Sequence, residues 1–152
     1  MADISIYVGT VYGNSLEVAE VIQEQLQQLG HTVTLEEPGT IESIKSAANI
    51  IFCTSTTGAG DLPDDMEVLY YDLKNQFPIL SKQTFSVVGL GDSSYGDTFC
   101  GGGRKVHALL NELQGIQVLD LFILDASESF EPEKDILKWI PEYHAELATI
   151  QQ

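Results

Sequence analysis

Basic residues are few in this sequence, and that shortage is its most unusual bulk property. Only 7 Lys and Arg stand against 23 Asp and Glu in 152 residues, giving a formal net charge of −16. Because phosphate backbones and anionic headgroups repel such a charge, the composition argues against nucleic-acid binding and against docking on a membrane. A docking partner is expected to offer a basic patch, since opposite potentials speed encounter. Charge alone is equally compatible with simple solubility.

Cysteine is scarce as well: Cys53 and Cys100 are the only two, and they form no Cys-x-x-Cys pair. Two isolated thiols make neither a disulfide framework nor a metal site, so we interpret them as reduced and mostly buried. Long apolar runs are also missing. The longest, such as Ile50-Ile51-Phe52-Cys53, have the length of a strand and fall short of the ~18 residues of a membrane span. No basic region precedes the pattern that begins at Ile4, so no secretory signal is predicted and a cytoplasmic location is expected.

The sequence does contain a regular alternation of strand and helix patterns. Apolar residues make up 43% of the chain, enough for one full core. Periodicity predicts strands at residues 4–8, 31–35, 49–53, 85–90 and 118–125, and helices at 16–29, 41–48, 64–77, 105–113 and 133–150. Pro141 is expected to kink or interrupt the last helix. The alternation predicts a single α/β domain over residues 1–152, a doubly wound five-stranded parallel sheet that fits the known order 2-1-3-4-5.

Three loops follow the first, third and fourth predicted strands, and they hold the clusters of Gly, Ser, Thr and Asp. They cover residues 10–15, 54–63 and 91–100. In an open α/β sheet, ligands bind outside the carboxyl ends of the strands, at the point where the strand order reverses. We therefore expect these three loops to meet at one ligand site.

The first loop runs from a strand end into a helix start, where unpaired N–H groups and the helix dipole favour a phosphate. Gly13 lets the backbone curl close to an anion, and Thr10, Asn14 and Ser15 supply side-chain donors. The loop contains no Lys or Arg and matches neither a Walker loop nor Gly-x-Gly-x-x-Gly. On local grounds, an ordinary helix capped by Ser15 or Asn14 is an equal alternative.

The other two loops extend this pattern. Ser55 and Thr56 would continue the hydroxyl cradle. Tyr95 and Phe99 are aromatics in a polar loop; a flat ligand stacking on Tyr95 is one explanation, and anchoring to the core by Phe99 is another.

Taken together and in order, the three loops resemble the FMN-binding loops of flavodoxins. The segments are Thr10-Val11-Tyr12-Gly13-Asn14-Ser15, Ser55-Thr56-Thr57-Gly58-Ala59-Gly60-Asp61, and Gly91-Asp92-Ser93-Ser94-Tyr95 with Phe99-Cys100. The resemblance runs from Ile4 to the last helix. Because the fifth predicted strand carries no long insertion, the chain is similar to short-chain flavodoxins, most of all to the small MioC- and YqcA-type proteins and the FMN domains of diflavin reductases.

The resemblance implies a flavodoxin-like fold, FMN as the cofactor, and a role for each matched residue. The phosphate would be held by Thr10, Tyr12, Gly13, Asn14, Ser15 and Ser55. The ribityl chain and inner ring face would lie along Thr56, Thr57 and Gly58, the outer face on Tyr95, and the pyrimidine edge on backbone groups of Asp92 and Cys100. The predicted cofactor-binding set also includes Val11, Ala59, Gly91 and Phe99.

Two departures from the family pattern stand out. Thr57 takes a place where many flavodoxins have Trp or Tyr, so weaker shielding of the flavin and a lower FMN affinity are expected. Three residues separate Tyr95 from Phe99, one more than in some short-chain members. The contacts of Phe99 and Cys100 are therefore the least defined of the set.

The implied function is electron transfer between a flavodoxin reductase-type donor and an acceptor enzyme, both basic at the surface, by a protein expected to be monomeric. No residue has the setting of a catalytic nucleophile or base, because His31, His107 and His144 are scattered and lie outside the loops. We therefore predict a carrier with no substrate turnover of its own and no metal. Acids near the ring-binding loops would disfavour an anionic reduced flavin and lower the potential for the second electron; they are Asp61, Asp64, Asp65, Asp92 and Asp97.

Three other functions were weighed. An FMN-binding sensor or storage module is hardly separable from a carrier by sequence. An NAD(P)H quinone reductase on the same fold would need a nicotinamide and quinone site, for which the chain has no spare segment. A phosphoacceptor receiver domain needs an Asp at the end of the third strand, where Thr54 and Ser55 stand.

Overall fold

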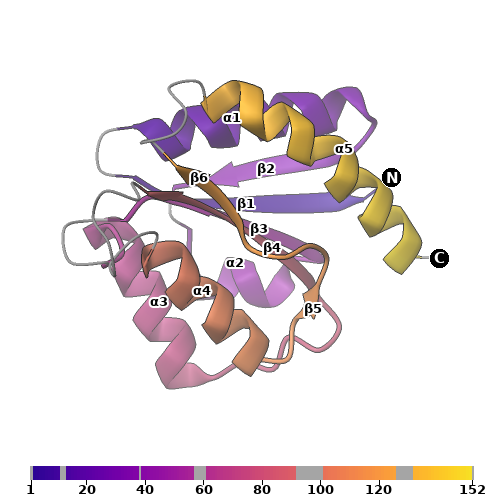
Figure 1. Ribbon diagram of the computed structural model, residues 1–152. Coiled ribbons are helices and arrows are strands. Elements are labelled where there is room, and N and C mark those ends of the chain that lie inside the picture. Colours follow the sequence, from indigo (N-terminus) through magenta and orange to yellow (C-terminus); the bar gives the residue numbers. More distant parts are fainter. Residues whose placement is uncertain are drawn as a thin grey trace.

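The structure is a computed structural model that describes residues 2–10, 13–37, 39–56, 61–91, 101–125 and 132–151. Strands and helices alternate along these residues (Figure 1). The strands are β1 (Asp3–Gly9), β2 (Thr32–Glu36), β3 (Asn49–Thr54), β4 (Thr84–Gly91), β5 (Ile116–Gln117) and β6 (Phe122–Asp125). The helices are α1 (Asn14–Gln28), α2 (Ile41–Ser46), α3 (Asp64–Gln76), α4 (Gly101–Glu112) and α5 (Pro132–Ile150).

One parallel sheet organises the molecule, with the strand order β2-β1-β3-β4-β5 and with β6 also paired to β4. This confirms the predicted doubly wound order. The reversal point lies between β1 and β3, since β1 pairs with β2 on one side and with β3 on the other. The carboxyl ends of β1, β3 and β4 therefore meet at one edge, which is where ligands bind in such sheets.

Each face of the sheet has its own hydrophobic core. In the central strand β3 every residue is buried, and because side chains alternate along a strand, Ile51 and Cys53 enter one core while Ile50 and Phe52 enter the other. The first core is covered by α1 and α5, and the second by α2, α3 and α4 (Figure 1). Burial on both faces explains why this strand reads as an unbroken apolar run.

The fifth strand differs from the prediction. Instead of one strand over residues 118–125, two short strands, β5 and β6, pair with opposite ends of β4. In the residues between them, the amide of Gln117 donates to the carboxylate of Asp120 at 2.8 Å. Asp has a low strand propensity, and a local side-chain bond of this kind competes with ladder pairing at a sheet edge. The break is short, so no long insertion is present.

The last helix is not interrupted, because α5 continues through Pro141. Pro141 lies on the exposed side, whereas Trp139 and Tyr143 are buried against the first core. Trp139 is therefore a packing residue of the first core. In the part of the chain that the structure describes, no helix has both the length and the apolar character that a bilayer crossing requires.

Candidate functional site

The first loop ends in a helix start that no side chain caps. Gly13 is the N-cap residue of α1, with φ 88° in the left-handed region and no side-chain cap hydrogen bond among the described residues. Its N–H donates to the Thr10 hydroxyl at 2.7 Å, which holds the turn closed. The alternative of an ordinary helix capped by Ser15 or Asn14 is therefore wrong. Without a cap, the first-turn amides and the positive end of the dipole face the loop.

Hydroxyl groups connect this helix start to the ends of β1 and β3. Ser15 is fully buried, and its hydroxyl donates to the carbonyl of Gly9 at 2.6 Å. The Ser55 hydroxyl donates to Ser15 Oγ at 3.1 Å, and the Ser55 N–H donates to the same Gly9 carbonyl at 3.0 Å. Ser15 is thus enclosed by the protein, whereas Ser55 is half-buried and its hydroxyl can turn its proton toward a ligand.

Thr56 links the second loop to α4. Its hydroxyl oxygen accepts a hydrogen bond from the N–H of Gly102, in the first turn of α4, at 3.1 Å. A Cβ at Gly102 would lie 2.8 Å from the carbonyl oxygen of Ser55, so only glycine allows the helix to approach the end of β3 this closely. The sequence prediction missed Gly102, although the run of three glycines at the start of α4 was a signal for it.

Charges near the site are partly paired. Lys105 Nζ on α4 lies 3.0 Å from Asp61 Oδ1 at the end of the second loop, and both side chains are largely exposed. The hydrogen bond to Asp61 raises the pKa of Lys105. Further acids, Asp64, Asp65 and Glu67, occupy the first turn of α3, where a helix dipole favours them. The negative field expected from Asp61 is therefore partly neutralised by Lys105.

The structure places part of the predicted cofactor-binding set at this edge of the sheet: Thr10, Gly13, Asn14, Ser15, Ser55, Thr56 and Gly91. Asn14 is exposed at the start of α1, and Gly91 ends β4. The remaining predicted residues lie outside the described residues: Val11, Tyr12, Thr57, Gly58, Ala59, Asp92, Tyr95, Phe99 and Cys100. The predictions for these residues stand as predictions.

The histidines and Cys53 lie away from this edge or are sealed from solvent. His31 and His144 are hydrogen-bonded to each other, so describing them as scattered was wrong, but they lie beside the start of β2, outside the three loops. Burial raises the pKa of the Cys53 thiol, which donates to the Ser15 carbonyl. Within the described ranges, no group of three or more His, Cys, Asp or Glu side chains is placed to hold a metal ion.

Comparison with known proteins decides the family. Residues 6–139 match the flavodoxin family. This chain is a flavodoxin. It is 39% identical over 145 residues to Flavodoxin YqcA of Escherichia coli (94% of this chain, 97% of the relative). It is 31% identical over 140 residues to Protein MioC of the same species (92% and 95%). The solved structure of a cysteine-to-alanine variant of a flavodoxin from Pseudomonas aeruginosa superposes with a TM-score of 0.89 at 40% identity (96% and 99%).

Membership in this family makes the chain an FMN-binding electron-transfer protein, of the short MioC and YqcA type. The residues present fit that cofactor. FMN offers a phosphate, and the edge offers an uncapped helix start, the hydroxyls of Thr10 and Ser55, and a backbone turn at Gly13. A phosphate is well received by such amides and hydroxyls even without a basic side chain.

Proposed function

We propose that this flavodoxin takes electrons from a reductase and passes them to acceptor enzymes, with the FMN phosphate held at the start of α1. The observation that carries the proposal is the uncapped N-terminus of α1, beside hydroxyls at the ends of β1 and β3. When bound, FMN supplies the redox chemistry, and the protein binds it, orients it and sets its electrostatic surroundings.

In this proposal the described residues divide the work of binding the phosphate. The first-turn amides of α1, the Thr10 hydroxyl and the Ser55 hydroxyl face the phosphate. Ser15 supports them from behind, because its own proton is directed to the Gly9 carbonyl. Asn14, exposed at the helix start, adds a side-chain donor. Neutral donors suit a carrier, since they hold the phosphate without adding positive charge near the flavin.

The ring is proposed to lie between the second and third loops, on Thr57, Gly58 and Tyr95. The hydrogen bond from Gly102 to Thr56 supports this placement, because it fixes the start of α4 against the end of β3. Thr56 is therefore proposed to position the loops as well as to line the ribityl chain.

The partners are proposed to be proteins with basic surfaces, a reductase-type donor and an acceptor, met one after the other. The formal net charge of −16 supports this, because opposite potentials raise association rates without requiring tight binding. Contacts of this kind are small and short-lived. We further propose that the protein is a cytoplasmic monomer with no substrate turnover of its own.

A comparison of FMN with riboflavin tests the phosphate site. We expect FMN to bind at least about a hundredfold more tightly than riboflavin, which corresponds to about 2.7 kcal/mol from the phosphate. Thr10→Ala and Ser55→Ala are expected to weaken FMN binding about tenfold each and to leave riboflavin binding unchanged. Ser46→Ala is the matched control, since this exposed hydroxyl bonds only to carbonyls of its own helix. Equal affinity for FMN and riboflavin would refute the proposed phosphate site.

A second experiment separates the carrier from its alternatives. The FMN-loaded protein is reduced anaerobically by NADPH and a purified flavodoxin reductase, and then mixed with ferric cytochrome c as an acceptor. A carrier is reduced only when the reductase is present and is reoxidised rapidly by cytochrome c. Reduction without reoxidation would indicate a sensor or storage module, and reduction by NADPH alone would indicate a quinone reductase-like enzyme.

A further inference from the structure

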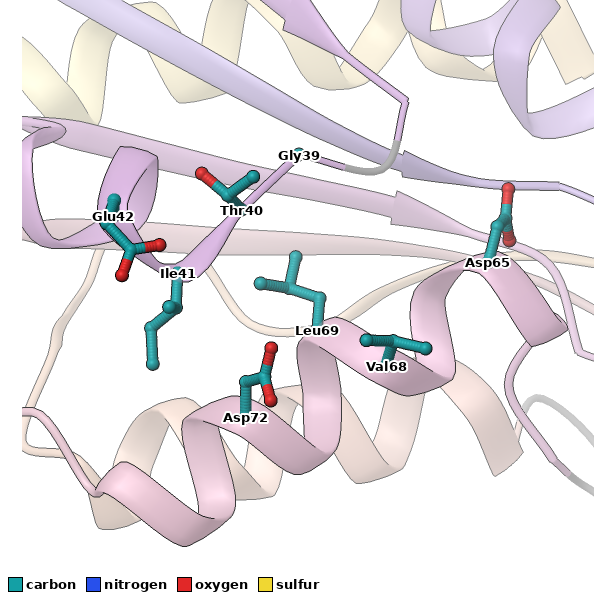
Figure 2. A pocket seen from close by; sticks show the side chains of 8 residues that line it. All are labelled: Gly39, Thr40, Ile41, Glu42, Asp65, Val68, Leu69 and Asp72. Atoms are coloured by element: carbon teal, nitrogen blue, oxygen red, sulfur yellow. The ribbon is translucent and has the colours of Figure 1, made fainter.

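A groove of about 280 Å³ lies between α2 and α3, on the face of the sheet opposite α1 and α5 (Figures 1 and 2). Eight residues line it, four from the start of α2 and four from α3: Gly39, Thr40, Ile41, Glu42, Asp65, Val68, Leu69 and Asp72. None of them belongs to the predicted cofactor-binding set. The groove is thus a separate feature of the surface.

The groove combines an apolar floor with an acidic rim. Ile41 and Leu69 are buried between the two helices. Glu42 and Asp72 lie near them, and Asp65 lies further along, at the start of α3 (Figure 2). No basic side chain lines the groove. Beside it on α3, Val68 is 67% exposed and Tyr71 is 50% exposed, so apolar surface continues out of the groove onto the helix.

One carboxylate oxygen of this rim lacks a partner. Asp65 Oδ1 is buried and receives no hydrogen bond from any residue that the structure describes. Leaving a buried carboxylate oxygen without a donor is unfavourable, and a positive charge brought to the rim would offset part of this cost through the electrostatic field. The rim is not suited to a metal ion, because no metal-binding group of acids or histidines is found in the described ranges.

The two ends of the groove lie at different distances from the second loop. Asp65 lies in the first turn of α3, which begins directly after the second loop. At the other end, Lys45 Nζ donates to Gln76 Oε1 at 3.2 Å and joins the two helices. The end of the groove at Asp65 is therefore the end nearer the second loop.

We propose that this groove is a docking site for a lysine- or arginine-bearing surface of a redox partner protein. Basic side chains of the partner lie along the rim of Glu42, Asp65 and Asp72, and an apolar neighbour on the partner packs on Val68 and Tyr71. The inference rests on the proposed carrier function. Charge selects the occupant: a second copy of this chain, with 23 acids against 7 bases, is repelled by the rim, whereas a basic partner is attracted.

The test uses FMN-loaded, fully reduced protein and ferric cytochrome c, a small basic haem protein, mixed in a stopped-flow instrument. Glu42→Gln with Asp72→Asn removes two rim charges. Glu20→Gln with Glu24→Gln removes two exposed charges from α1, on the other face of the sheet, and serves as the control. We expect the rim pair to lower the second-order rate constant at low salt about fivefold and the control pair less than about twofold.

Two further readouts complete the design. Val68→Ser keeps every charge and is expected to lower the rate constant about threefold at both low and high salt, since apolar contact is not screened. FMN affinity, the visible spectrum and the midpoint potentials are measured for each variant. All are expected to equal those of the unmodified protein, so that a changed rate reports docking and not a damaged cofactor site.

Equal slowing by the rim pair and the control pair would mean that net charge alone guides the partner, and would overturn the proposal. If the protein binds FMN but transfers no electrons, the proposed carrier function is wrong and the rate constants cannot test the groove. Amide chemical shifts of the protein, titrated with cytochrome c, therefore test the groove separately. Shifts centred on Val68 and Leu69 support the groove, and their absence overturns it. A concentration-dependent dimer with shifts at the same residues would assign the groove to a second copy, and would overturn it too.

Discussion

His31 and His144 share a direct hydrogen bond, with Nε2 of His31 2.8 Å from Nδ1 of His144 although 113 residues separate them. The other nitrogen of His31, Nδ1, accepts from the Ala2 N–H at 3.2 Å. His31 therefore carries its proton on Nε2 and donates it to His144. A proton added to His31 at Nδ1 must break the bond from the Ala2 N–H, and one added to His144 at Nδ1 must break the bond between the two rings. The pair joins the start of β2 to α5, so this break would loosen the first core.

Acid is expected to weaken the fold through this pair. Burial lowers the pKa of His31, and the nearby His144 lowers it further. Below a pH of about 6.5 the unfolded chain therefore binds a proton that the folded chain resists, so the free energy of unfolding falls as pH falls. Between about pH 7.5 and 5.5, the free energy of unfolding of the unmodified protein is expected to fall by about 1 kcal/mol more than that of His31→Gln. Urea unfolding at each pH measures this.

His107→Gln is the control for the histidine experiment. Burial also lowers the pKa of His107, but this residue lies outside the pair. Its removal is expected to leave the contribution of His31 and His144 intact. Relief of repulsion among the many acids at low pH affects all variants alike. Identical pH profiles for His31→Gln and the unmodified protein would refute the assignment.

Gly102→Ala is expected to damage both stability and cofactor binding. The added Cβ would lie 2.8 Å from the Ser55 carbonyl and force α4 away from the end of β3, at a cost of about 1–3 kcal/mol. FMN affinity is expected to fall about tenfold because the hydrogen bond to Thr56 is strained. Gly115→Ala makes a similar clash with Phe85, on the opposite side of the molecule. Gly115→Ala should lower the melting temperature but not the FMN affinity. An equal loss of FMN affinity in both variants would contradict the role given to Gly102.

Two buried tyrosines are expected to respond oppositely to loss of the hydroxyl. Tyr143 is fully buried, its hydroxyl finds no partner in the described structure, and burial raises its pKa. Tyr143→Phe should leave stability unchanged or raise it by up to about 1 kcal/mol. Tyr7 bonds to Ser43 at 2.9 Å, and Ser43 in turn donates to Glu36. Tyr7→Phe should lower the free energy of unfolding by about 1 kcal/mol. Thermal unfolding of the Tyr7→Phe and Tyr143→Phe variants measures this difference.

The pairing of Lys105 with Asp61 is expected to influence the flavin more than the fold. Both side chains are largely exposed, so Lys105→Gln should barely change the melting temperature. It releases the negative field of Asp61 and should lower the potential for the second electron. The shift is expected to be on the order of 20 mV, from charges ~10 Å apart in water. Asp61→Asn should raise the potential for the second electron. If neither variant changes this potential, Asp61 does not influence the flavin electrostatically.

The fold was predictable because burial on both faces leaves a strong pattern in the sequence. Ile50 to Cys53 form an apolar run typical of a central parallel strand, and Gly30, with φ 95°, follows the end of α1. The fifth strand was predicted less well, since Asp120 interrupts a pattern that is otherwise apolar. The start of α4 was placed four residues late, because its glycines have low helix propensity and are held by tertiary contacts.

The site was predictable only as a set of residue types at strand ends. Hydroxyls at Thr10, Ser15 and Ser55 were found from the sequence. That Ser15 is a buried support, whereas Thr10 and Ser55 are accessible donors, depends on hydrogen bonds that only the structure shows. The pairing of His31 with His144 joins distant segments and has no local signal. The groove between α2 and α3 is likewise a product of helix packing.

Thr56 supplies a hydrogen-bond acceptor to a helix that begins 45 positions later in the chain. That helix opens with three glycines, each of which disfavours an isolated helix by about 1 kcal/mol relative to alanine. Its first turn consequently depends on β3 already being in place. A peptide covering residues 101–125 should stay unstructured in water, and during folding α4 should acquire protection from hydrogen exchange only after the central strands have assembled.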